Sequence, residues 1–184
     1  MKIVAENTGA LCERVFSGRM PYGTAVSVPV GCEAVFVRGG QVIDVLRAGE
    51  HTVNARTGFT LRSAPKETCE VYSVARSRPF DILWGVGGIV SGGRTYGVSG
   101  TYRVSVDNPQ SLLRTFGFRD RIDADAVRSA LKSAVSDAVR ESFGRPDLSA
   151  AVKTKLTGTA LYYGLFLESF HADEIMEVGA QEDA

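Results

Sequence analysis

The sequence has no excess of charge of either sign. Its 184 residues contain 21 Lys and Arg against 21 Asp and Glu, so the formal net charge is zero. A protein that binds nucleic acid or an anionic membrane surface through its overall charge carries a basic excess or a basic patch. In the middle of this chain the basic residues alternate with acidic ones, which is typical of a solvated helix surface. We therefore expect no nucleic-acid partner.

Cysteine and long apolar runs are also scarce. The chain has three cysteines, whereas a small secreted domain stabilised by disulfides is denser in cysteine and usually has an even number. No segment approaches the ~18 consecutive apolar residues of a membrane-spanning helix. The opening residues, MKIVAENTG, place Glu6 and Asn7 where the apolar core of a signal peptide would lie. We expect a cytoplasmic chain without direct membrane insertion, although peripheral association with a membrane through a partner stays possible.

Residues 24–106 alternate between apolar and polar side chains, which is the period of half-buried β-strands. The runs with this period are 24–30, 33–38, 41–47, 51–55, 59–63, 70–75 and 80–84. Gly39-Gly40 separates two of them and predicts a β-hairpin, because glycine adopts the positive φ of a tight turn at little cost. Asp44 falls on the apolar side of its run, which predicts a position at a strand edge or beside a cation.

Glycine is concentrated in one segment, WGVGGIVSGG (84–93). It predicts a flexible hairpin connection, with a mobile loop over 84–97, joined to a long alternating strand over 94–106. A dinucleotide-binding turn requires a helix directly after its glycines. Because a strand follows here, the segment does not match that fingerprint.

Helical patterns begin after residue 107. Asn108 is a good N-cap and Pro109 suits the first helical position, so a short amphipathic helix is predicted from there to Gly117. A second helix is predicted over 123–143, with an apolar stripe that includes Leu131. A third helix is predicted over 147–163 and a final strand over 165–171.

These patterns predict an α+β fold. A twisted antiparallel sheet built from the first two-thirds of the chain should pack against two or three helices, and the final strand should return to the sheet. We expect residues 1–23 to form an N-terminal arm, 24–176 a single domain and 177–184 an acidic tail.

The side chains that could bind a metal are few and dispersed. A structural zinc site needs paired ligands two to four residues apart. No two of the candidate ligands are that close: Cys12, Cys32, Cys69, His51 and His171. The sequence therefore predicts neither a metal site nor another cofactor.

The sequence also lacks a recognisable catalytic arrangement. A serine or cysteine nucleophile needs a histidine base, and there are only two histidines and no G-x-S-x-G elbow. We expect no catalytic residues and no enzyme. A further interpretation is an enzyme with a dispersed site around His51, Asp44 and Cys32.

Four segments resemble motifs of the SPFH superfamily (stomatin, prohibitin, flotillin), in particular its soluble virion-core-protein-like branch. They are EAVFVRGGQVIDVLRAGEHTV (33–53), FDILWG (80–85), GTYRVSVDNPQSLL (100–113) and YGLFLESFHADEI (163–175). Their order matches an opening hairpin, a Trp-Gly element, a strand-to-helix junction and a last strand of that branch. The resemblance spans roughly residues 24–176.

This resemblance implies a non-enzymatic scaffold or recruitment module that acts by self-association or protein–protein binding. Exposed strand edges of a β-rich domain are consistent with such a role, because an edge strand can pair with another chain. The alternative is a protein that binds a small molecule or nucleotide through the glycine-rich 84–97 loop.

Overall fold

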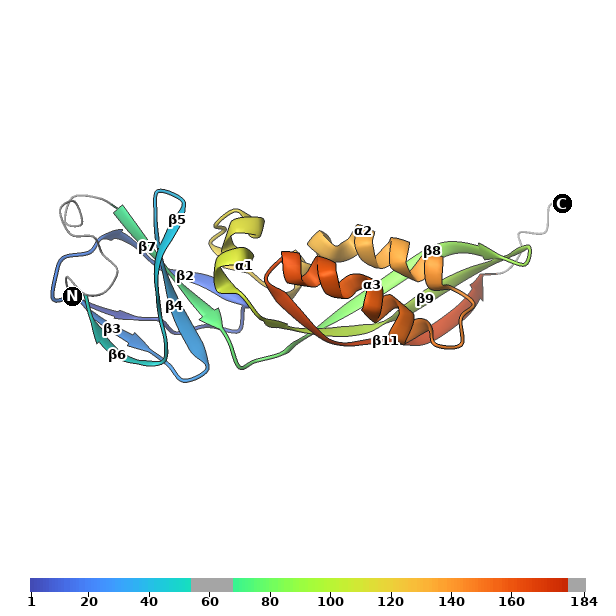
Figure 1. The fold of residues 1–184 in the computed structure, drawn as a ribbon, viewed down its shortest axis with the longest axis horizontal. Coiled ribbons are helices and arrows are strands. Elements are labelled where there is room, and N and C mark those ends of the chain that lie inside the picture. Colours follow the sequence, from blue (N-terminus) through green and yellow to red (C-terminus); the bar gives the residue numbers. More distant parts are fainter. Residues whose placement is uncertain (54–67, 179–184) are drawn as a thin grey trace.

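The computed structural model describes residues 1–53 and 68–178. This part of the chain contains eleven strands and three helices, arranged in two lobes along one axis (Figure 1). The N-terminal lobe is built of strands, and the C-terminal lobe has two helices lying along a long three-stranded sheet. The predicted α+β class is confirmed.

The N-terminal lobe consists of two packed sheets. One has the order β1 (Lys2–Val4), β3 (Ala25–Val28), β6 (Gly49–Thr52), and its β1–β3 pair is parallel. The other is antiparallel, in the order β10 (Arg121–Ile122), β2 (Cys12–Arg19), β7 (Thr68–Ala75), β4 (Cys32–Arg38), β5 (Gln41–Leu46). Buried apolar side chains that include Val26, Phe36 and Val71 fill the space between the two sheets.

The predicted hairpin at Gly39-Gly40 joins β4 to β5. The two glycines have φ of +55° and +73°, and Arg38 pairs with Gln41 across the turn. Asp44 lies on β5, the outermost strand of its sheet, and its Oδ1 accepts a hydrogen bond from the Val45 backbone N–H at 2.8 Å. The expected edge position of this carboxylate is confirmed.

The C-terminal lobe contains the predicted hairpin connection, but most of its glycine-rich residues belong to strands and not to a loop. Residues 84–97 belong to a hairpin between β8 (Phe80–Ser91) and β9 (Arg94–Val106), with its turn at Gly92-Gly93. A bulge between Val86 and Ile89 accommodates the inner glycines of β8. Glycine content alone suggested a loop, but every second side chain of β8 is buried, and this burial keeps the segment in the sheet.

The final strand, β11 (Leu165–Val178), returns to the sheet as predicted and pairs antiparallel with β9, giving the order β11-β9-β8. It is longer than the predicted 165–171, so Glu177 and Val178 of the expected acidic tail are strand residues. The rest of that tail, 179–184, and the predicted strand at 59–63 lie outside the described residues.

All three predicted helices are present: α1 (Pro109–Phe116), α2 (Ala124–Ser142) and α3 (Leu148–Tyr162). The side chain of Asn108 accepts a hydrogen bond from the Ser111 N–H at 3.0 Å, and Asp123 accepts one from the Ala126 N–H at 2.9 Å. Both side chains satisfy backbone donors that have no partner within the helix. Among the described residues, no helix is both long and apolar enough to span a bilayer.

The first 23 residues are not a separate arm. They supply β1 and β2, and β2 pairs with β7 and β10 inside the five-stranded sheet. The strands also divide among three sheets rather than forming one. Alternation shows that a segment is a strand but not which strand it pairs with, so the partition could not be derived from the pattern.

Candidate functional site

The structure does not bring together the three residues of the dispersed-site interpretation. Asp44 pairs with Phe36 on β4, four positions along that strand from Cys32, which corresponds to ~13 Å. His51 belongs to the other sheet of the lobe, where its Nε2 lies 2.7 Å from the Arg47 carbonyl oxygen. Within the described residues, these side chains form no nucleophile–base pair.

The cysteines are three separate thiols. Burial raises the pKa of the Cys12 thiol far above its ordinary value, and it raises the pKa of Cys69 to about 11. The thiolate is the reactive form of cysteine, so both groups are poor nucleophiles and poor metal ligands at neutral pH. Cys32, at the beginning of β4, is half-buried.

We expect an aromatic disulfide reagent to modify one thiol quickly in the folded protein at neutral pH. Cys32 should react, because Cys12 and Cys69 combine burial with a raised pKa. The amount of coloured thiolate released gives the number of reactive cysteines per chain. This number should rise to three when the protein is unfolded in denaturant. Fast release from two or three native thiols, or unchanged fast release from Cys32→Ser, would contradict this assignment.

Metal ligands are not clustered in the described part of the chain. Within residues 1–53 and 68–178, no group of three or more His, Cys, Asp or Glu could hold an ion. His171, the other candidate ligand, lies on β11 opposite Thr101.

The feature that distinguishes the C-terminal lobe is an uncovered sheet face. Helices α2 and α3 lie on one face of the sheet β11-β9-β8 (Figure 1). No described element covers the other face, which we call the open face. The register places on it every second residue of the middle strand: Thr95, Gly97, Ser99, Thr101, Arg103 and Ser105.

Large apolar side chains flank this row of small residues on both outer strands. Leu83 on β8 is 68% exposed and lies opposite Thr101, while Met176 on β11 is 54% exposed and lies opposite Gly97. The other exposed apolar side chains of the open face are Val90, Phe166 and Val178. The open face therefore has a row of small or polar residues along β9, which we call the central row, with apolar side chains on either side.

Among the described residues, the open face carries an ion pair and an unpaired carboxylate. The Arg103 guanidinium donates from Nε and Nη2 to the two carboxylate oxygens of Asp81, at 2.7 and 2.9 Å. This pairing holds the pKa of Asp81 below its ordinary value. Glu174 lies opposite Ser99 and makes no ion pair with the described residues, so covering it carries a desolvation cost that the paired charges largely avoid.

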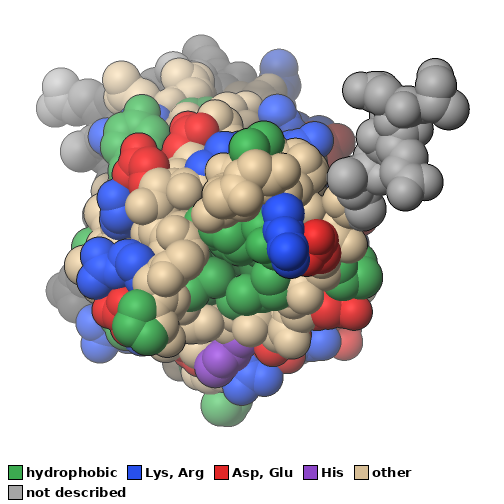
Figure 2. Space-filling model, turned by 90° about the vertical axis from the view of Figure 1, so that its right-hand side faces the viewer, with side chains coloured by type: hydrophobic (Ala, Val, Ile, Leu, Met, Phe, Trp, Pro, Cys, Tyr) green, Lys and Arg blue, Asp and Glu red, His purple; other side chains and the backbone are tan. Residues whose placement is uncertain are grey.

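Apolar side chains also reach the C-terminal end of the molecule. Figure 2 views this end and shows hydrophobic side chains gathered in a central hollow, with basic and acidic side chains around them. Ile175 of β11 is 55% exposed, and it lies opposite Val98, on the face of the sheet that carries the helices. This apolar surface is therefore separate from the open face.

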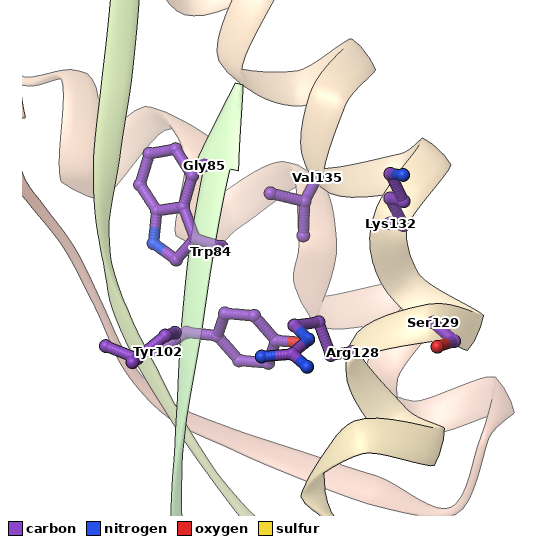
Figure 3. A pocket seen from close by; sticks show the side chains of 8 residues that line it. Trp84, Gly85, Tyr102, Arg128, Ser129, Lys132 and Val135 are labelled. Carbon is purple, nitrogen blue, oxygen red and sulfur yellow. The ribbon is translucent and has the colours of Figure 1, made fainter. Parts of the chain in front are cut away.

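A cavity lies between the edge strand β8 and α2. It is bounded by Leu83, Trp84 and Gly85 of β8, by Tyr102 of β9 and by the side of α2 (Figure 3). The Trp84 indole stacks on Phe170 with centroids 4.7 Å apart and donates from Nε1 to the His171 carbonyl oxygen at 3.2 Å. These contacts fix the aromatic floor of the cavity.

Sequence reasoning did not identify the open face, and for the cavity it named only the 84–97 segment, to which Trp84 and Gly85 belong. A signal for the open face was present, because residues 95–105 alternate small or polar side chains with buried ones. No signal could assign the cavity, since it depends on how α2 lies against β8.

No model of a known protein family matches the chain, and no curated protein sequence matches it.

Proposed function

We propose that this protein is a non-enzymatic scaffold module that self-associates through the open face of the sheet β11-β9-β8. The observation that carries the proposal is the uncovered sheet face, on which Leu83, Phe166, Met176 and their apolar neighbours are exposed. Contiguous exposed apolar surface on a protein marks an interaction site more often than chance exposure does.

The size of the open face is adequate for a pair of identical chains. Three strands span ~14 Å and the 13 residues of β9 extend ~40 Å, so each copy offers roughly 600 Å² before side-chain relief is counted. Two copies would bury roughly 1,200 Å², which lies within the range of stable interfaces.

The open face has small residues beside large apolar ones, so that two copies of it can fit against each other. In a two-fold arrangement, Met176 and Val178 of one copy would pack against Gly97 and Ser99 of the central row of the other, and the reverse contact would follow by symmetry. Two twisted sheets pack in this way with strands at about −30° and a separation of about 10 Å. A second copy is therefore the occupant that fits both the small residues and their apolar flanks.

The resemblance of residues 24–176 to the SPFH superfamily supports a scaffold role, because self-association or partner recruitment is what that resemblance implies. We place the module in the cytoplasm, since its three cysteines are free and two of them are buried. Any contact with a membrane would be peripheral and would occur through a partner.

Sedimentation velocity over a range of protein concentrations tests the proposal. The unaltered chain should shift from monomer to dimer with increasing concentration, and Met176→Glu should remain monomeric because each copy would bury a carboxylate against the central row of the other. Leu161→Glu is the matched control, since Leu161 is exposed on α3, away from the open face.

A strictly monomeric unaltered chain would overturn the proposal. Equal weakening by Met176→Glu and Leu161→Glu would overturn it as well, because the association would then not depend on the open face. Circular dichroism spectra of both variants should match that of the unaltered chain.

A further inference from the structure

The cavity between β8 and α2 has a volume of about 440 Å³, within the range of small-molecule sites. Its floor is apolar and includes Trp84 and Val135, while the exposed side of α2 contributes Arg128, Ser129 and Lys132 (Figure 3). The cavity thus combines an apolar body with a cationic and hydroxyl-bearing rim.

The hydroxyl of Tyr102 is the most informative group in the cavity. Tyr102 is 1% exposed, and its hydroxyl has no hydrogen-bond partner among the described residues. Figure 3 shows its ring extending from β9 toward Arg128. A buried polar group without a partner costs about 1–3 kcal/mol, so a ligand that accepts a hydrogen bond here would remove an existing penalty.

The two cationic side chains of the rim differ in their ion pairing. The Arg128 guanidinium donates from Nη2 to Asp125 Oδ1 at 2.6 Å, and its other N–H groups make no bond with the described residues. Lys132, one turn further along α2, has no ion-pair partner within the described part of the chain. The rim therefore presents positive charge that the protein itself does not neutralise.

We infer that this cavity binds a small amphiphilic acid, a molecule with one carboxylate or phosphate group on an apolar body. The acidic group would lie between Lys132 and Arg128 and accept a hydrogen bond from the Tyr102 hydroxyl. The apolar body would lie against Trp84 and Val135. The cavity adjoins the open face at the edge strand β8, because Leu83 borders both of them. Binding is therefore measured at protein concentrations at which the chain is monomeric.

Trp84 provides a direct readout, because it is the single tryptophan of the chain. Benzoate and phenyl phosphate serve as anionic probes, and benzyl alcohol and benzylamine as neutral and cationic counterparts of similar size. Both anions, or one of them, should change Trp84 fluorescence saturably and bind at least about tenfold more tightly than the counterparts. The ratio of the dissociation constants of benzoate and phenyl phosphate shows whether the site prefers a carboxylate or a phosphate group.

Two variants and a control locate the binding site. Lys132→Gln and Tyr102→Phe should each weaken binding of the preferred anion by about tenfold in calorimetric titration. Lys155→Gln removes a lysine of α3 that pairs with Glu141, away from the cavity, and should leave the affinity unchanged. Tyr102→Phe should melt at the same or a higher temperature, because it removes an unpartnered hydroxyl.

Equal binding of the anionic and neutral probes would overturn the inference. So would absence of any saturable response, or equal effects of Lys132→Gln and Lys155→Gln. None of these results depends on whether the chain dimerises, since each titration can be run below the dimerisation range.

Discussion

Leu131→Asp should unfold the protein. Leu131 lies in the middle of α2, is 2% exposed and belongs to the cluster of apolar side chains shared by the helices and the long sheet. Removing a buried leucine side chain costs about 2–5 kcal/mol, and burying a carboxyl group without a partner adds several more. Together these approach or exceed the 5–15 kcal/mol by which a typical domain is stable.

Circular dichroism measures this effect, and two companion variants calibrate it. Leu131→Ala should fold but melt at a lower temperature, because it creates a cavity without burying a charge. Ser133→Asp places the same carboxylate on the exposed side of α2 and should change the stability by less than about 1 kcal/mol. A cooperative melt of Leu131→Asp at the temperature of the unaltered chain would refute the position assigned to α2.

Gly164→Ala should strongly destabilise the protein. Gly164 connects α3 to β11 with φ of +74°, and its carbonyl oxygen accepts hydrogen bonds from the N–H groups of Asp107 and Asn108. A Cβ at this position would lie 2.4 Å from the Asn108 carbonyl oxygen and 2.5 Å from the Leu112 nitrogen. Both are backbone atoms, so the overlap can be relieved only by moving α1 away from the turn.

We expect Gly164→Ala to destabilise the protein by about 4 kcal/mol or more, from positive-φ strain together with this overlap. The same change at Gly158 provides the control, because Gly158 is an exposed residue inside α3 and an added Cβ would meet no atom within 4 Å. Gly158→Ala should stabilise by about 0.5–1 kcal/mol, since alanine is the better helix former. Thermal melts should thus shift in opposite directions, and a similar shift for both variants would contradict the close approach at Gly164.

The elements that could be predicted from the sequence are those specified by local chemistry. Asn108, Pro109 and Gly117 define α1 because capping and positive φ depend on a few adjacent residues. The Gly39-Gly40 hairpin is local for the same reason. The apolar stripe around Leu131 predicted α2 because its period is contained within one element.

The partition of strands into sheets could not be predicted, because it depends on contacts between distant segments. β2 pairs with β7, more than fifty residues away in sequence, and β1 pairs in parallel with β3. The glycine-rich residues 84–93 show a related error: their composition favoured a loop, whereas pairing with β9 and burial under α2 hold them in a strand.

The candidate sites were predictable only in part. Alternation along residues 95–105 gives the two faces of β9, but not which face the helices cover. The cavity places Tyr102 of β9 beside Arg128 and Lys132 of α2, and only the crossing of these elements produces that arrangement.

The pairing of β9 with β11 has a consequence for how the protein is made. Val106 and Leu165 are neighbours in the sheet, and the intervening segment contains all three helices. On a ribosome that adds about 5–20 residues per second, the β8–β9 hairpin emerges seconds before its last partner strand. During that interval β9 presents an unpaired edge, which is the kind of surface through which incompletely folded chains aggregate.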